Sequence, residues 1–131
     1  MTIQRFEDIV AWQRARVLTK DVYACTRVGA FAKDYGLKDQ IQRASVSSMA
    51  NISEGFERGG DREFVQFLSN SKGSCGEVKS RLYVALDQNY IAPVSFNQLY
   101  SQADEVSRLV SGSMTYLRDS SVRGHKYKGR P

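Results

Sequence analysis

Apolar residues recur at steps of three and four along most of this chain, which is the spacing of amphipathic α-helices. No run of alternating apolar and polar residues bounded by turns marks a β-strand. The first helical segment should begin after Asp8, an effective N-cap, and end at Gly29. Its apolar stripe comprises Ala11, Ala15, Leu18, Val22 and Cys25, and is widened by Val10, Trp12, Val17 and Val28.

A second helix is predicted over residues 37–56, and Gly59 and Gly60 should end it. The serines at positions 45, 47 and 48 weaken the helix propensity of its middle turns and favour a bend there.

A third helix, capped by Asp61, is predicted to continue through Tyr90, with apolar residues that alternate at steps of four and three. This alternation is typical of the seam of a bundle or coiled coil. Gly73 and Gly76 lie inside it, and residues this small indicate close contact with another helix or with another chain.

Pro93 should end the third helix, and Ser95 with Gln98 forms a capping box that opens a fourth. Four amphipathic helices joined by short turns predict an all-α fold, an antiparallel up-and-down four-helix bundle. We therefore divide the chain into a bundle over residues 1–118 and a flexible basic tail over residues 119–131.

The formal net charge is +5, and the excess is uneven. The tail contributes +3, from Arg123, Lys126, Lys128 and Arg130 against Asp119. A basic chain favours an acidic partner. Nucleic acid is the commonest such partner, and an anionic membrane surface or an acidic protein is the alternative.

Two basic surfaces are candidate nucleic-acid contacts. In the tail, the same four cations and Arg118 surround Tyr127, whose ring can stack on a base. The outer face of the first helix carries Arg16, Lys20 and Arg27, which would become a positive belt if the chain formed a ring. The alternatives are a tail that only aids solubility and an ordinary solvated helix face.

The second helix places four polar side chains on one face, at steps of four, four and three: Arg43, Ser47, Asn51 and Glu54. We interpret them as a buried hydrogen-bond network that fixes helix register or a subunit contact, with a ligand site as the alternative. Glu54 would pair with Arg43, or with Arg58 one turn further on. If the ion pair is buried, removing one partner should cost about 3–5 kcal/mol.

The sequence offers little for catalysis, and we expect no enzyme and no cofactor. The single histidine, His125, lies in the tail, and no GxSxG, P-loop or GxGxxG motif occurs. Cys25 and Cys75 form no CxxC or Cys/His cluster, so no metal site is expected. We expect them to be buried thiols, with a disulfide or a reactive cysteine as the alternative.

The N-terminal residues lack the apolar core of a signal peptide, and no stretch approaches about 20 apolar residues. We therefore expect a cytoplasmic protein without a membrane role. Trp12 and Tyr35 are expected at a subunit interface, because Trp and Tyr concentrate in interface hot spots.

Taken together, the short motifs of this chain resemble one known family over roughly residues 5 to 118. The family is that of the four-helix-bundle proteins encoded in intervening sequences of bacterial large-subunit ribosomal RNA genes, to which the accessory variability determinants of diversity-generating retroelements are similar. The motifs are Phe6-Glu7-Asp8 with Trp12, Tyr35-Gly36-Leu37, Gln40-Ile41, Arg43-Ala44, Val46-Ser47, Asn51-Ile52, Glu54-Gly55, Glu63-Phe64, Phe67-Leu68, Gly73-Ser74 and Glu77.

The resemblance implies a four-helix protomer that assembles as a cyclic homopentamer with a basic surface suited to nucleic acid, and no known enzymatic activity. The chain departs from the family pattern in two places. Members usually carry proline within the segment that here reads Ser47-Ser48-Met49-Ala50, and an apolar helix in place of Ser69-Asn70-Ser71-Lys72.

We therefore hypothesise a non-enzymatic oligomer that binds RNA or DNA through pooled basic surfaces, without reading the bases. The alternative is an assembly module that recruits a protein partner, in which the positive charge serves only solubility or steering. Salt-dependent binding to nucleic acid separates the two.

Overall fold

The computed structural model describes residues 3–126, with side chains through Asp119, and within that range it contains four α-helices and no β-strand. The α-helices are α1 (Val10–Thr26), α2 (Tyr35–Arg58), α3 (Asp61–Asp87) and α4 (Pro93–Lys126), and two short 3₁₀ helices, η1 (Phe6–Asp8) and η2 (Gly29–Lys33), flank α1. The predicted all-α fold is confirmed.

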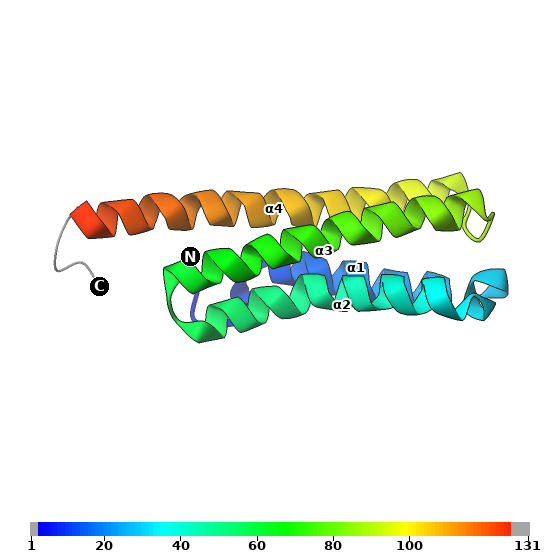
Figure 1. Cartoon of the computed structure of the whole chain (residues 1–131), viewed down its shortest axis with the longest axis horizontal. Helices are drawn as coiled ribbons and strands as arrows, with labels where there is room; N and C mark the ends of the chain where they lie inside the picture. The colour runs from blue at the N-terminus through cyan, green and yellow to red at the C-terminus, as the bar shows by residue number, and fades with distance from the viewer. Residues whose placement is uncertain (1–2, 127–131) are drawn as a thin grey trace.

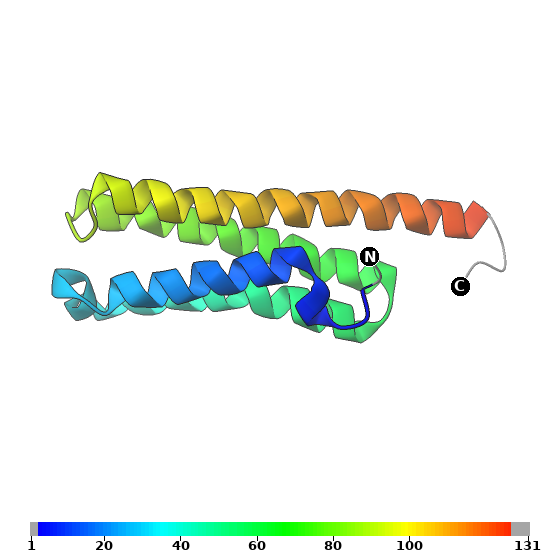
Figure 2. The same cartoon turned by 180° about the vertical axis from the view of Figure 1, so that it is seen from behind.

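The helices lie side by side along the long axis of the molecule (Figure 1). Helix α1 packs against α2 and α4, and α3 packs against α2 and α4, so chain neighbours are also spatial neighbours. Short connections make consecutive helices antiparallel, as in an up-and-down bundle. Seen from behind, α1 is much the shortest helix, and α4 extends beyond the end where the N-terminal segment lies (Figure 2).

The core follows the predicted stripes. Fully buried side chains come from every helix, among them Leu18 of α1, Ile52 of α2, Leu82 of α3 and Val106 of α4. The expected widening of the first stripe is wrong for its valines, because Val10, Val17 and Val28 are exposed on the outer side of the bundle. A helix of this fold has neighbours on only part of its circumference, so those valines exceed what the core can take.

All four helix starts differ from those predicted, and α2 begins at Tyr35, two residues before the expected start. Pro93 is the first residue of α4, where its missing N–H costs nothing, and does not end the helix before it. Helix α3 begins at Asp61 itself, after Gly60. The Asp8 carboxylate accepts from the backbone N–H groups of Gln4 and Arg5, so it caps η1, and α1 starts two residues later.

Helix ends depend on glycine where the backbone turns left-handed. Gly59 ends α2 as predicted, with φ of +84°, a conformation that costs glycine little. The fourth helix was expected to end near Arg118, but the backbone of α4 stays helical to Lys126. The expected flexibility of residues 127–131 lies outside the described residues.

Hydroxyl groups link neighbouring helices through the carbonyls of α2. Thr19 of α1 donates to the Ser45 carbonyl at 2.9 Å, and Ser71 of α3 donates to the Ser48 carbonyl at 2.6 Å. Helix α2 is nevertheless continuous through its serines, and Ser45 and Ser48 each donate back to a carbonyl of the preceding turn. These small side chains let α1 and α3 approach α2 closely.

The end of the bundle opposite the α4 extension is tied together by the two interhelical connections. Asp34 caps α2 by accepting from the N–H of Leu37 at 3.1 Å, and its other oxygen accepts from the Tyr90 hydroxyl at 2.9 Å. This hydrogen bond raises the pKa of Tyr90. The Tyr90 ring stacks on buried Phe31, with ring centres 5.3 Å apart.

Candidate functional site

The outer face of α1 is the basic surface that stands out in the structure. Arg16, Lys20 and Arg27 are all exposed on it, and within residues 3–119 none has a carboxylate within 4 Å. Helix geometry separates Arg16 from Lys20 by about 6 Å along the axis. Free, closely spaced cations of this kind are suited to phosphate groups, because no internal ion pair has to break first.

Five cations on the other helices are engaged in ion pairs. The ion pairs are Arg43 with Asp39, Arg58 with Glu54 and Glu63, Arg81 with Glu77, and both Lys79 and Arg108 with Asp104. Lys79 is the least exposed of these cations, and its ammonium donates to the Asp104 carboxylate at 2.8 Å, which lowers the pKa of that carboxyl. Lys38, Arg62, Lys72 and Arg118 also lack a carboxylate within 4 Å among residues 3–119, but each stands alone on its helix face, whereas α1 carries three such cations on one face.

A shallow hollow of about 370 Å³ lies on this face, between Trp12, Arg16 and Lys20. Trp12 is half-buried and packs edge-on against Phe6, with ring centres 5.1 Å apart. The Arg16 guanidinium lies 5.9 Å from the centre of the indole ring. A flat ring beside free cations can accommodate either a base or the edge of a neighbouring subunit.

The four polar residues predicted on α2 do not form a single buried network. Asn51 donates to the Ser47 hydroxyl at 2.9 Å, and Ser74 of α3 donates to the same hydroxyl at 2.8 Å. Arg43, whose side chain is 80% exposed, instead pairs with Asp39 one turn earlier. Glu54 pairs with Arg58, the alternative left open above, and both side chains are about half exposed. Helical spacing places all four residues on one side of α2, but α3 covers only the middle of that side.

This arrangement changes the expected effect of Glu54→Ala. Exposed ion pairs one turn apart contribute little to stability, because water screens both charges. We expect the thermal unfolding curve of Glu54→Ala to superimpose on that of the unmodified protein. Ser74→Ala, which removes a partly buried interhelical hydrogen bond, serves as the comparison and should unfold at a lower temperature. A large loss of stability for Glu54→Ala alone would show that Glu54 is buried in an assembly.

The other predicted site residues are scattered. Tyr35 begins α2 and is 74% exposed beside Lys38, as an interface anchor would be in a free protomer. Arg118 is exposed on α4, a different helix from the one that carries Arg16 and Lys20. The side chains of Arg123, Lys126, Lys128 and Arg130 lie outside the described residues, so their grouping with Arg118 stays a prediction.

Both cysteines are free thiols; Cys75 is buried as expected, whereas Cys25 is only partly buried. Burial raises the pKa of Cys25 and of Cys75 to about 11, so each stays protonated at neutral pH. Within residues 3–119 no three His, Cys, Asp or Glu side chains lie close enough to hold a metal ion. Among the described helices, none has both the length and the hydropathy that crossing a bilayer requires.

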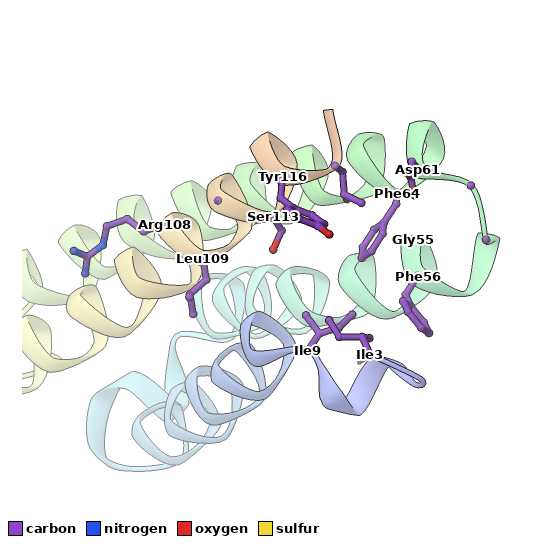
Figure 3. Close-up of a pocket in the computed structure, with 14 residues that line it drawn as sticks. Ile3, Ile9, Gly55, Phe56, Asp61, Phe64, Arg108, Leu109, Ser113 and Tyr116 are labelled. Atoms are coloured by element: carbon purple, nitrogen blue, oxygen red, sulfur yellow. The ribbon is translucent and has the colours of Figure 1, made fainter. Parts of the chain in front are cut away.

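Sequence reasoning missed a groove of about 760 Å³ at the end of the bundle beside the N-terminal segment (Figure 3). We call this the end groove; its apolar walls are Ile3, Ile9, Phe56, Phe64, Leu109 and Leu117. Tyr116 and Phe64 lie on its upper side in the figure, and Ile3 and Ile9 lie below. The only signal in the sequence was the shortness of the first apolar stripe relative to the others.

Comparison with known proteins agrees with this fold. The family model for the 23S rRNA-intervening sequence protein matches residues 7–112. Among solved structures, the chain is similar to a protein of unknown function from the S23 ribosomal protein family of Bacteroides thetaiotaomicron VPI-5482, with a TM-score of 0.72 and 17% identity over 79% of this chain and 97% of that one. At that identity the likeness shows the fold alone. No match is found among curated protein sequences.

Proposed function

This chain belongs to the 23S rRNA-intervening sequence protein family, and from that premise we propose that it is a cytoplasmic, non-enzymatic oligomer that binds RNA or DNA through the outer face of α1. Three exposed cations without internal partners carry the proposal: Arg16, Lys20 and Arg27. Contacts to phosphates position a protein on nucleic acid without reading its sequence.

Assembly of several protomers would make the three α1 cations sufficient for binding nucleic acid. Three cations per protomer are too few for strong binding, but a cyclic homopentamer built through Trp12 and Tyr35 repeats them around a ring. Trp12 supports this arrangement because it borders the cations and is only half-buried, so a neighbouring subunit can cover its ring. Tyr35 lies at the far end of α2 and is exposed.

The test compares binding to single-stranded and duplex RNA across a series of salt concentrations. The slope of log K against log salt changes by about 0.7 to 0.9 for each phosphate contact. The variant with Arg16, Lys20 and Arg27 all changed to Ala should bind weakly and show a slope reduced by about 2 to 3 per protomer engaged. Light scattering on the same samples gives the subunit count.

A matched control separates local contacts from overall charge. Changing Arg43, Arg58 and Arg108 to Ala removes the same three charges, but each of these side chains already has a carboxylate partner. We expect this control to keep most of the salt slope. If the two triple variants lost equal amounts of affinity and of salt slope, α1 would be excluded as the binding surface. If the unmodified protein did not bind RNA at low salt, the alternative would be favoured, a module that recruits a protein.

A further inference from the structure

The end groove lies where the first helix is too short to cover the other three. Helix α1 has 17 residues and α3 has 27, a difference of about 15 Å at 1.5 Å per residue. On that side the groove is bordered by Ile3 and Ile9, which precede α1 (Figure 3). The bundle therefore leaves apolar surface of α2, α3 and α4 open at this end.

The walls of the end groove are apolar, and the protomer does not fill the space between them. Phe56 of α2 and Phe64 of α3 meet edge-on, with ring centres 6.1 Å apart, and both line the groove. On α4 the lining residues Leu109, Ser113 and Leu117 follow at steps of four, and both leucines are only partly buried. The volume of about 760 Å³ is typical of pockets that hold small molecules, and such pockets occur between the helices of bundles.

One end of the groove carries positive charge that the protein does not fully neutralise. Arg108 lies at that end (Figure 3). Its guanidinium is 3.3 Å from the Asp104 carboxylate, but Lys79 donates to the same carboxylate at 2.8 Å. Two cations therefore share one anion, and no other carboxylate of residues 3–119 lies within 4 Å of either cation. The Arg108 side chain is 73% exposed, so it can turn toward a ligand.

The carboxylate at the other end of the groove is stabilised locally. Asp61 is the first residue of α3, where the positive end of the helix dipole favours a negative side chain, and it is exposed to water. The unbalanced charge at the groove is therefore the positive charge beside Arg108. The ligand complementary to this site has an apolar body and an anionic end.

We propose that the end groove binds a free fatty acid, with its carboxylate at Arg108 and its hydrocarbon chain along Leu109, Phe64 and Leu117. Arginine and a carboxylate form charge-assisted hydrogen bonds, which are stronger than those between neutral groups. Between Arg108 and Leu117, α4 runs beside the groove over about 14 Å, so a chain of medium length can be removed from water. None of the α1 cations lines this groove, so the site is separate from the proposed nucleic-acid surface.

Calorimetric titration with octanoate, decanoate and laurate, each below its micelle concentration, tests the proposal. Each buried CH₂ group should tighten binding about fourfold, until the chain exceeds the groove. Decylamine carries the same kind of chain with the opposite charge, and it should bind about tenfold or more weakly than decanoate. Affinities that do not depend on chain length would overturn the proposal, as would decylamine that binds as tightly as decanoate.

Three variants locate the site. Arg108→Glu should weaken decanoate binding about tenfold or more. Arg43→Glu is its matched control, because Arg43 is also exposed and also pairs with an aspartate one turn earlier, and it should leave the affinity unchanged. Ser113→Phe places a ring between Leu109 and Leu117 and should abolish binding, with folding verified by circular dichroism. Equal affinities of the two charge variants, or normal binding by folded Ser113→Phe, would overturn the proposal.

Phosphatidylglycerol vesicles distinguish a free fatty acid from a membrane lipid, since both combine an anionic group with acyl chains. A basic protein can bind such vesicles through its charge alone, so the unmodified protein and Ser113→Phe are compared. We expect equal vesicle binding by the two. Vesicle binding lost in Ser113→Phe, without decanoate binding by the unmodified protein, would assign the groove to a membrane lipid and overturn the proposal. The triple variant of the α1 cations should bind decanoate normally, so failure of either proposal leaves the other standing.

Discussion

Replacing Phe31 by alanine should lower the free energy of unfolding by about 3–5 kcal/mol, the range for removing a fully buried aromatic ring. Phe31 is 0% exposed although it lies in η2, the connection between α1 and α2, and not in a main helix. Its ring stacks on Tyr90 in the connection between α3 and α4. Truncating the side chain to alanine leaves a cavity. Filling that cavity would require both interhelical connections to move inward.

Urea denaturation followed by circular dichroism measures this effect. Tyr90→Phe is the comparison, because it keeps the stacked ring and removes only the hydroxyl that donates to Asp34. We expect Tyr90→Phe to lower the free energy of unfolding clearly less than Phe31→Ala does. Equal losses would mean that the hydrogen bond, and not the buried ring, holds this end of the bundle.

The second large effect is expected at Gly55, where side chains of α3 lie close against the backbone of α2. A Cβ atom at this position would lie 2.6 Å from the Cβ of Phe67 and 3.0 Å from a ring carbon of Phe64. Relief of that overlap requires the helices to move apart, since one of the contacts is next to the backbone. We expect Gly55→Ala to lower the free energy of unfolding by about 1–3 kcal/mol despite the better helix propensity of alanine.

Gly73→Ala and Gly76→Ala are matched controls for this prediction. Both glycines lie inside α3, and a Cβ atom at either would meet nothing within 4 Å. Alanine is the better helix former by about 1 kcal/mol, so each control should be more stable than the unmodified protein. If Gly55→Ala also stabilises, α2 and α3 are not held at the observed separation. If the controls destabilise, these glycines contact another chain.

The same glycines show how far the sequence could be interpreted. The sequence analysis predicted that Gly73 and Gly76 contact another helix or another chain; both are exposed in the protomer, so only the second alternative stays open, and the close contact between helices lies at Gly55. Composition marks a position where close approach is possible. Which glycine meets a neighbouring helix depends on the rotation of each helix about its axis, and that rotation is set by packing against all its neighbours at once.

The polar face of α2 shows the same limit. Its spacing was interpreted correctly, since Ser47 and Asn51 do interact, and Glu54 does pair within one helical turn. The burial was wrong, because α3 contacts the middle of that face and leaves both ends to solvent. The end groove was missed altogether, since it depends on the relative lengths and starting levels of three helices.

The amino-acid sequence by itself determined the number of helices, their core stripes and the row of cations along one face of α1, because these follow from local periodicity and from residue type. Only the tertiary structure decided which cations remain unpaired, which glycine forms a close contact and where the bundle lacks a helix. Those properties depend on distances between residues far apart in the chain, and such distances are fixed by the packing of whole helices rather than by any local pattern.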